Sequence, residues 1–92
     1  MKYIVVDAPG GEAAVLFPRT FLHRWVAGLF APMTVVSAGF VRVREGGLEC
    51  YGHSAGLGMN ARPIADTALV ARALAETDAA SASWTGLITD AG

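Results

Sequence analysis

Two short apolar runs separated by a glycine-rich turn begin the chain. Residues 2–7 (KYIVVD) are rich in β-branched and aromatic side chains, which favour a β-strand. Residues 8–11 (APGG) are typical of a turn, and residues 13–17 (AAVLF) can return as the antiparallel partner, which Pro18 ends. The pattern predicts an N-terminal β-hairpin.

A helical period follows this hairpin. Thr20 can cap a helix that runs through about Phe30, and Pro32 prevents its continuation. The spacing of the large apolar residues places them on one broad face, and His23 lies away from it on the solvated side. The apolar face consists of Phe21, Leu22, Trp25, Val26 and Leu29.

The longest predicted strand covers residues 35–44 (VVSAGFVRVR), and the next residues turn it back. A two-residue loop of Gly46 and Gly47 would fix the pairing of the two strands. Opposite charges, and an arginine and an aromatic ring, would then meet across the strands, which supports a second hairpin. The expected opposing pairs are Arg44 with Glu49, Val43 with Cys50, Arg42 with Tyr51, and Phe40 with His53.

A second helix is predicted from Pro63 to about Glu76. Proline suits the first turn of a helix, and Asp66 would lie near the positive end of the helix dipole. Asp66 falls opposite the apolar face together with Leu69, so an exposed Leu69 would suit a contact between subunits; alternatively, the helix is buried on two sides. The apolar face consists of Ile64, Ala68, Val70, Ala71, Leu74 and Ala75.

These elements predict an α+β fold in the order ββαββα, with antiparallel hairpins and both helices packed on one face of the sheet. Residues 1–78 are expected to form this single domain. Residues 79–92 are expected to be a C-terminal tail that is either flexible or docked as a short strand. The tail is small and polar apart from Trp84, Leu87 and Ile88.

The composition indicates self-association. Of 92 residues, 53% are hydrophobic and only 16% are charged, whereas a typical domain has about 25% charged residues. A small domain has too much surface to hide so many apolar side chains. A homo-oligomer, a dimer or larger, would cover the excess.

The charge and the cysteine content indicate which partners and which cellular compartment to expect. The formal net charge is −1 with no long run of one sign, which indicates neither a nucleic-acid nor a membrane partner. The uncharged stretch 25–41 is shorter than the roughly 20 residues of a bilayer span, and Pro32 interrupts it. Asp7 follows only four apolar residues, unlike a signal peptide, and the single cysteine suits a reducing compartment. We expect a cytoplasmic protein without a cofactor.

One stretch matches a catalytic motif. Residues 52–56 (GHSAG) spell G-x-S-x-G, in which α/β-hydrolases place their serine nucleophile. Those enzymes need a histidine after the serine, but the two histidines, His23 and His53, both precede Ser54. We interpret the motif as coincidental and expect no enzyme. A small esterase-like hydrolase that uses Ser54 is the alternative.

The same glycine-rich stretch is a candidate ligand site. A turn that leads into a helix N-terminus offers backbone N–H groups, and Arg62 adds a cation, so a phosphate or carboxylate could bind there. The simpler interpretation is that the glycines permit a sharp strand-to-helix connection and that Asn60 caps it locally. The candidate ligand residues are Ser54, Gly56, Gly58, Asn60 and Arg62.

A candidate interaction surface lies on the second hairpin. Its aromatic and basic side chains could stack on a base or on a partner, although such a face is more often covered by the chain's own helix or by another subunit. The residues of this surface are Phe40, Arg42, Tyr51 and His53, with Leu69 on the second helix. Two scattered histidines and one cysteine do not make a metal site.

Four short blocks carry a resemblance to a known group of proteins. They are residues 35–40 (VVSAGF), 49–54 (ECYGHS), 57–58 (LG) and 61–63 (ARP). They resemble a group of small uncharacterised proteins encoded by phages and prophages of proteobacteria, over residues 34–74. The resemblance transfers no active site. It implies a cytoplasmic accessory protein that occupies or sequesters a host component, including defence systems.

The leading hypothesis is therefore a non-enzymatic, oligomeric accessory protein. It would bind a host protein or a small anionic or nucleotide ligand. A purely structural oligomeric module is the further alternative.

Overall fold

The structure is a computed structural model that describes the backbone of residues 1–83 and the side chains of residues 1–76. Its elements are β1 (Lys2–Ala8), β2 (Gly11–Phe17), α1 (His23–Leu29), β3 (Thr34–Arg44), β4 (Gly47–Tyr51), β5 (His53–Ser54), β6 (Met59–Asn60) and α2 (Pro63–Ser83). The α+β class and the ββαββα order of the main elements are confirmed. The small β5–β6 pair is an addition to the predicted set.

Helix α2 is longer than predicted. It extends to Ser83, beyond the expected end at Glu76, and so includes residues 79–83 of the predicted tail. The rest of that predicted tail, residues 84–92, lies outside the described residues. Within residues 1–83, neither helix combines the length and apolar character that a membrane span requires.

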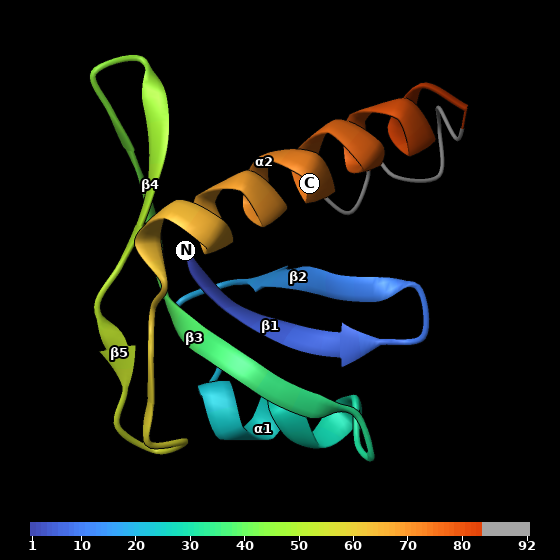
Figure 1. Ribbon diagram of the computed structural model, residues 1–92. Coiled ribbons are helices and arrows are strands. Elements are labelled where there is room, and N and C mark those ends of the chain that lie inside the picture. The colour runs from blue at the N-terminus through green and yellow to red at the C-terminus, as the bar shows by residue number, and fades with distance from the viewer. Residues whose placement is uncertain (84–92) are drawn as a thin grey trace.

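Four strands form one antiparallel sheet in the order β2-β1-β3-β4, so that β2 and β4 are its edges. The β1–β2 hairpin is as predicted, with Ala8 opposite Gly11 across a turn of Pro9 and Gly10. Figure 1 shows the sheet as a middle layer, with α2 on one side of it and α1 on the other.

The helices therefore lie on opposite faces of the sheet, not on one face as expected. The reason is in β1, where residues 3–6 are all buried. Successive strand side chains point to opposite faces, so a strand that is apolar on both faces needs cover on both. The α1 core consists of Ile4, Val6, Phe17, Val26 and Ala38, and the α2 core of Tyr3, Val5, Cys50 and Val70.

The β3–β4 hairpin pairs two residues away from the predicted register. Its turn is formed by Glu45 and Gly46, not by Gly46 and Gly47. Both turn residues have positive φ angles, 51° and 80°, which a type I′ turn requires. Because the shift is even, each side chain keeps its predicted face. The observed pairs are Phe40 with Tyr51, Val41 with Cys50, Arg42 with Glu49, Val43 with Leu48 and Arg44 with Gly47.

Helix α1 is shorter than predicted and presents a different face to the sheet. It begins at His23 and not near Thr20, because a turn precedes it in which the Phe21 N–H donates to the Pro18 carbonyl oxygen. His23 and Val26 are its buried residues. The rest of the predicted apolar face is exposed to solvent.

Helix α2 also buries a different face from the predicted one. Asp66, expected in solvent, is fully buried, whereas Ile64, expected inside, is 92% exposed. Leu69 packs against the α2 core and is not the exposed subunit contact that the sequence suggested. Hydrogen bonds to Asp66 from other elements, described below, explain why this polar side chain faces the sheet.

Candidate functional site

A buried carboxylate ties the start of α2 to the sheet. The Tyr3 hydroxyl donates to Asp66 Oδ2 at 2.5 Å, and the Ser37 hydroxyl donates to Oδ1 at 2.9 Å. The Arg62 backbone N–H and guanidinium donate to the same carboxylate at 2.8 Å and 3.0 Å. Burial, and then the bond to Asp66, raise the pKa of the Tyr3 hydroxyl far above its usual value, so the tyrosine remains a donor. The carboxylate is thus occupied by donors of the protein itself.

Arg62, the cation of the predicted ligand site, is paired on two sides. Its guanidinium lies 2.8 Å from a Glu12 oxygen and 2.9 Å from an Asp66 oxygen. The hydrogen bonds to Glu12 and then to Asp66 raise the pKa of the guanidinium. Arg62 therefore joins β2 to α2, and two carboxylates already balance its charge.

The glycine-rich stretch forms the small hairpin β5–β6. Its turn is closed by the Gly58 N–H, which donates to the Ala55 carbonyl oxygen, and Gly58 has a φ of 64° that glycine accommodates. Leu57 and Met59 of this hairpin pack against the α1 core. The hairpin therefore has a clear packing role.

The predicted ligand residues are divided by this arrangement. Gly56, Gly58 and Asn60 are exposed on the β5–β6 hairpin, whereas Ser54 is buried and Arg62 turns towards Glu12. Anion binding at this hairpin stays a prediction that lacks its expected free cation.

Ser54 has the geometry of a turn residue. Its hydroxyl is buried and accepts a hydrogen bond from the Leu57 backbone N–H at 3.3 Å, a common local bond of serine in turns. A serine nucleophile is served by a hydrogen-bonded base. Within the described residues, neither His23 nor His53 is hydrogen-bonded to Ser54.

An aromatic row crosses the α1 side of the sheet. The His23 ring lies edge-on to Phe17 and to Phe40, with centroids 5.5 Å apart in both pairs. The ring centroids of Phe40 and Tyr51 are 5.7 Å apart, and the guanidinium carbon of Arg42 lies 4.2 Å from the centroid of the Tyr51 ring. Phe40, Arg42 and Tyr51 share one face, as the hairpin pattern predicts.

Two details of the predicted interaction surface differ. Arg42, and not Arg44, is the arginine directly opposite Glu49; the two charged groups are 2.6 Å apart, and the bond lowers the pKa of the carboxyl. His53 is separated from this face because Gly52, with a φ of 81°, turns the chain after β4 into β5.

His23 is buried because the sheet supplies a partner for its ring. Its Nε2–H donates to the Gly39 carbonyl oxygen at 2.8 Å, and Phe17 and Phe40 flank it. Burial lowers the pKa of the imidazole. The expectation of a solvated His23 is therefore wrong. The Gly39 carbonyl oxygen accepts its hydrogen bond, and the Phe17 and Phe40 rings pack against the imidazole.

With His23 and Val26 inward, the segment around α1 presents its largest apolar side chains to solvent. Trp25 is 54% exposed and Leu29 is 64% exposed. Phe21 packs against Trp25 with ring centroids 5.2 Å apart. We call this outward set the α1 surface; it consists of Phe21, Leu22, Trp25, Leu29 and Met33.

The α1 surface is the candidate site that sequence reasoning missed. The periodicity identified four of its residues as one stripe but assigned them to the core. A clue was available in His23 and Val26, which lie three residues apart and so share a different side of the helix. Large apolar side chains gathered on a surface are typical of contact sites.

No family model, curated protein or solved structure matches this chain. Among the described residues, no three His, Cys, Asp or Glu side chains are grouped as a metal site would need. The candidate site is therefore defined by geometry. It is an exposed apolar surface around α1, on the side of the sheet that also carries the aromatic rings and Arg42.

Proposed function

We propose that the protein is a non-enzymatic binding protein that docks another protein through the α1 surface. The observation that carries this proposal is the exposure of the α1 side chains, above all Trp25 and Leu29. Tryptophan is enriched among the residues that dominate protein–protein binding energies. Burying Trp25 against a partner would remove apolar area from water and stabilise a complex.

The chemistry of the surface favours a protein partner. Its five residues are all uncharged and apolar, whereas nucleic-acid sites depend on Lys and Arg that neutralise phosphates. An apolar centre surrounded by polar groups is the usual anatomy of a protein interface. Arg24, between two of the surface residues in sequence, supplies one such polar group.

The resemblance to phage-encoded accessory proteins supports a host protein as the partner. In that setting the chain acts in the bacterial cytoplasm and blocks a surface of its target, such as a component of a defence system. Blocking requires a stable contact and no chemical step.

Self-association through the same surface is the second candidate, and the composition of the chain favours it. The predicted contact at Leu69 is packed within the subunit, so the α1 surface is where a second copy would cover apolar area. A homo-oligomer of this kind remains a prediction.

Affinity capture followed by reconstitution tests the proposal. The wild-type chain, Trp25→Glu and Leu29→Glu serve as baits in a lysate of a proteobacterium, and the captured protein is identified and purified. We expect its dissociation constant to rise about 30-fold or more for Trp25→Glu, the loss expected at the centre of an interface.

Ile64→Glu is the matched control, because Ile64 is 92% exposed and lies on α2, across the sheet from α1. It is expected to bind as the wild type does. If the purified partner binds both α1 variants with wild-type affinity, the proposal is wrong. A wild-type chain that captures only itself would identify the second copy as the occupant.

A further inference from the structure

We propose a second binding site, a groove between β2 and α2 in which an extended peptide segment of another protein adds to the sheet as a strand. This site is separate from the α1 surface and does not depend on the function proposed for it. Strand addition to an exposed sheet edge is a recurrent mode of peptide recognition.

The register shows which backbone groups of β2 are open. The Val41 N–H donates to the Met1 carbonyl oxygen, so the odd-numbered residues of this end of the chain direct their backbone groups towards β3. The even-numbered residues of β1 therefore bond to β2, where their partners are the odd-numbered residues 11–17. Glu12, Ala14 and Leu16 consequently direct their N–H and C=O groups away from the sheet. No partner for these groups occurs in the described part of the chain.

The opposite edge of the sheet, β4, is partly covered by α2. On β4, the Cys50 N–H, which points away from β3, donates to Thr67 Oγ1 of α2 at 3.1 Å. Proteins usually block an exposed edge with features such as a lysine, a proline or a β-bulge. Strand β2 has none of these three, since Gly11–Phe17 include no lysine or proline and pair with β1 without a bulge. The longer open edge is thus that of β2, a strand of seven residues against the five of β4.

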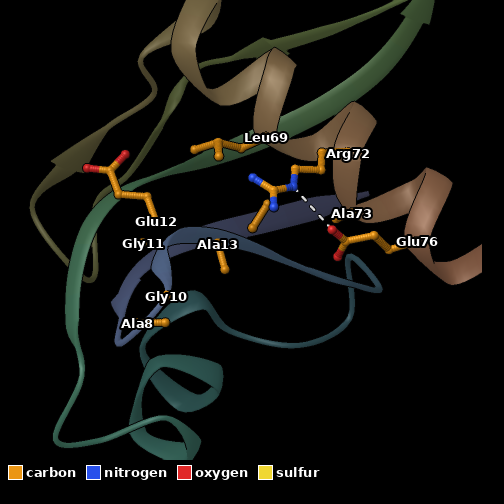
Figure 2. Close-up of a pocket in the computed structure, with 10 residues that line it drawn as sticks. Ala8, Gly10, Gly11, Glu12, Ala13, Leu69, Arg72, Ala73 and Glu76 are labelled. Atoms are coloured by element: carbon orange, nitrogen blue, oxygen red, sulfur yellow. Dashed lines mark hydrogen bonds and ion pairs between the residues drawn. The ribbon is translucent and has the colours of Figure 1, made fainter.

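A cavity lined by small apolar residues and by three charged ones, Glu12, Arg72 and Glu76, lies on one side of the place where α2 passes over β2. It has a volume of about 220 Å³. In Figure 2 the β1–β2 turn forms one wall, and Arg72 and Glu76, an ion pair at 3.1 Å, lie on the α2 wall. Leu69 and Ala73 complete the helix side.

An apolar cavity of about 540 Å³ lies at the other end of β2. Its lining is mainly apolar and includes one charged residue; it consists of Met1, Leu16, Phe17, Pro18, Arg19 and Leu74. The two cavities therefore follow the same open edge, one near Glu12 and one near Leu16.

These cavities define the peptide. An added antiparallel strand places alternate side chains on the α2 side, opposite Leu16, Ala14 and Glu12 in turn. The side chain opposite Leu16 enters the apolar cavity and is large and apolar. The side chain opposite Ala14 lies where Ala14 and Leu69 pack together under α2, and it is small. The side chain opposite Glu12 is polar, because Arg72 and Glu76 line that cavity. The recognised pattern is apolar-x-small-x-polar, read from the N-terminus of the peptide.

A second copy of β2 fits this groove poorly. Antiparallel pairing about Ala14 would place Glu12 of the second copy opposite Leu16, in the apolar cavity, and Leu16 of the second copy beside the Arg72–Glu76 ion pair. Arg19 lines the apolar cavity and could pair with that carboxylate, but the leucine would lie beside charged groups that suit a polar side chain. The groove therefore favours a different sequence as its occupant.

Peptide display followed by amide hydrogen exchange on the full chain tests this site. Random peptides of about seven residues, the length of β2, are selected on the wild type and are expected to carry the apolar-x-small-x-polar pattern. In the free protein, the amides of Ala14 and Leu16 should exchange rapidly, while those of Ala13 and Val15 are protected by β1. The selected peptide should slow exchange at Ala14 and Leu16 about ten-fold or more.

Ala14→Pro removes one outward N–H without removing a bond to β1. It should weaken binding of the selected peptide about ten-fold. Trp25→Glu, which alters only the α1 surface, should bind the peptide as the wild type does, so failure of one site is distinguishable from failure of the other.

Three results would overturn the inference. The first is slow exchange at Ala14 and Leu16 in the free protein, as occupation of the edge by residues 84–92 or by a second copy would produce. The second is wild-type affinity of Ala14→Pro for the peptide. The third is a selection that enriches no peptide. The exchange measurement uses the wild type and so does not depend on the folding of a variant.

Discussion

Two buried polar side chains anchor the helices of this protein. Asp66 fixes α2 through hydrogen bonds from Tyr3, Ser37 and Arg62, and His23 fixes α1 through its bond to the Gly39 carbonyl oxygen. A buried polar group without partners costs several kcal/mol. Each anchor is therefore a position where one substitution loosens a helix from the sheet.

Asp66→Ala is expected to lower the free energy of unfolding by about 3–5 kcal/mol. It leaves the Tyr3 and Ser37 hydroxyls buried without their acceptor and removes one partner of Arg62. Tyr3→Phe removes a single hydrogen bond and should cost about 1–3 kcal/mol. Urea denaturation followed by circular dichroism measures both. A loss below about 1 kcal/mol for Asp66→Ala would contradict the anchoring role.

His23 makes stability depend on pH. Burial and the charge of Lys2 lower its pKa, and the bond to the Gly39 carbonyl opposes them only in part. The unfolded chain then takes up a proton near the ordinary pKa of 6.5, while the folded chain stays neutral. The free energy of unfolding should be fully retained above pH 6.5 and should fall as the pH is lowered from there towards the folded pKa, by about 1.4 kcal/mol for each unit of pKa depression.

Denaturant unfolding of His23→Gln between pH 5.5 and 7.5 checks this dependence, since glutamine keeps a donor for Gly39 but does not titrate. The variant should lose most of the slope that the wild type shows. His53→Gln, at the exposed histidine, is the matched control and should keep that slope. Equal slopes for wild type and His23→Gln would show that another group is responsible.

The β3–β4 turn places a residue other than glycine, Glu45, in the left-handed region of backbone conformation. Glu45 adopts a φ of 51°, a left-handed conformation that costs most residues energy but suits asparagine. Glu45→Asn should therefore raise the free energy of unfolding by about 0.5–1 kcal/mol, seen as a higher Tm. Gly46→Ala, at a φ of 80°, should lower it. A stabilised Gly46→Ala would contradict the assigned turn.

The hairpins were predictable to different degrees. The turn predicted over residues 8–11 and its antiparallel return strand are confirmed. At the β3–β4 turn, two adjacent loops fit the sequence, and the observed one needs a positive φ at Glu45, which propensity argues against. The side chains still lie on their predicted faces of the sheet, because the register differs from the predicted one by two residues, an even number.

The helix faces were predicted wrongly for one physical reason. Helical periodicity assigns polar side chains to the solvent side. It cannot take account of a hydrogen-bond partner that a strand distant in sequence supplies to a buried polar side chain. Asp66 meets Tyr3 across 63 positions of sequence and Ser37 across 29, and His23 meets Gly39 across 16. The four buried residues of β1, by contrast, did contain the information that both sheet faces need a helix.

At the level of the whole chain, the composition indicated correctly that apolar side chains are left exposed, but it did not indicate where they lie. The apolar excess implied an uncovered surface, and the structure puts much of it on α1 and not at Leu69. The α1 surface and the β2–α2 groove lie on opposite faces of the sheet. One partner protein could therefore be held on α1 while a peptide segment occupies the groove.

Fluorescence quenching of Trp25 tests the docking of α1. A Trp84→Phe background leaves Trp25 as the single tryptophan, and acrylamide quenching is measured with the free chain and again with the purified partner. Because Trp25 is 54% exposed, we expect efficient quenching in the free chain and a several-fold reduction, about three-fold or more, when the partner buries the ring. Quenching that the bound partner leaves unchanged would contradict docking through the α1 surface.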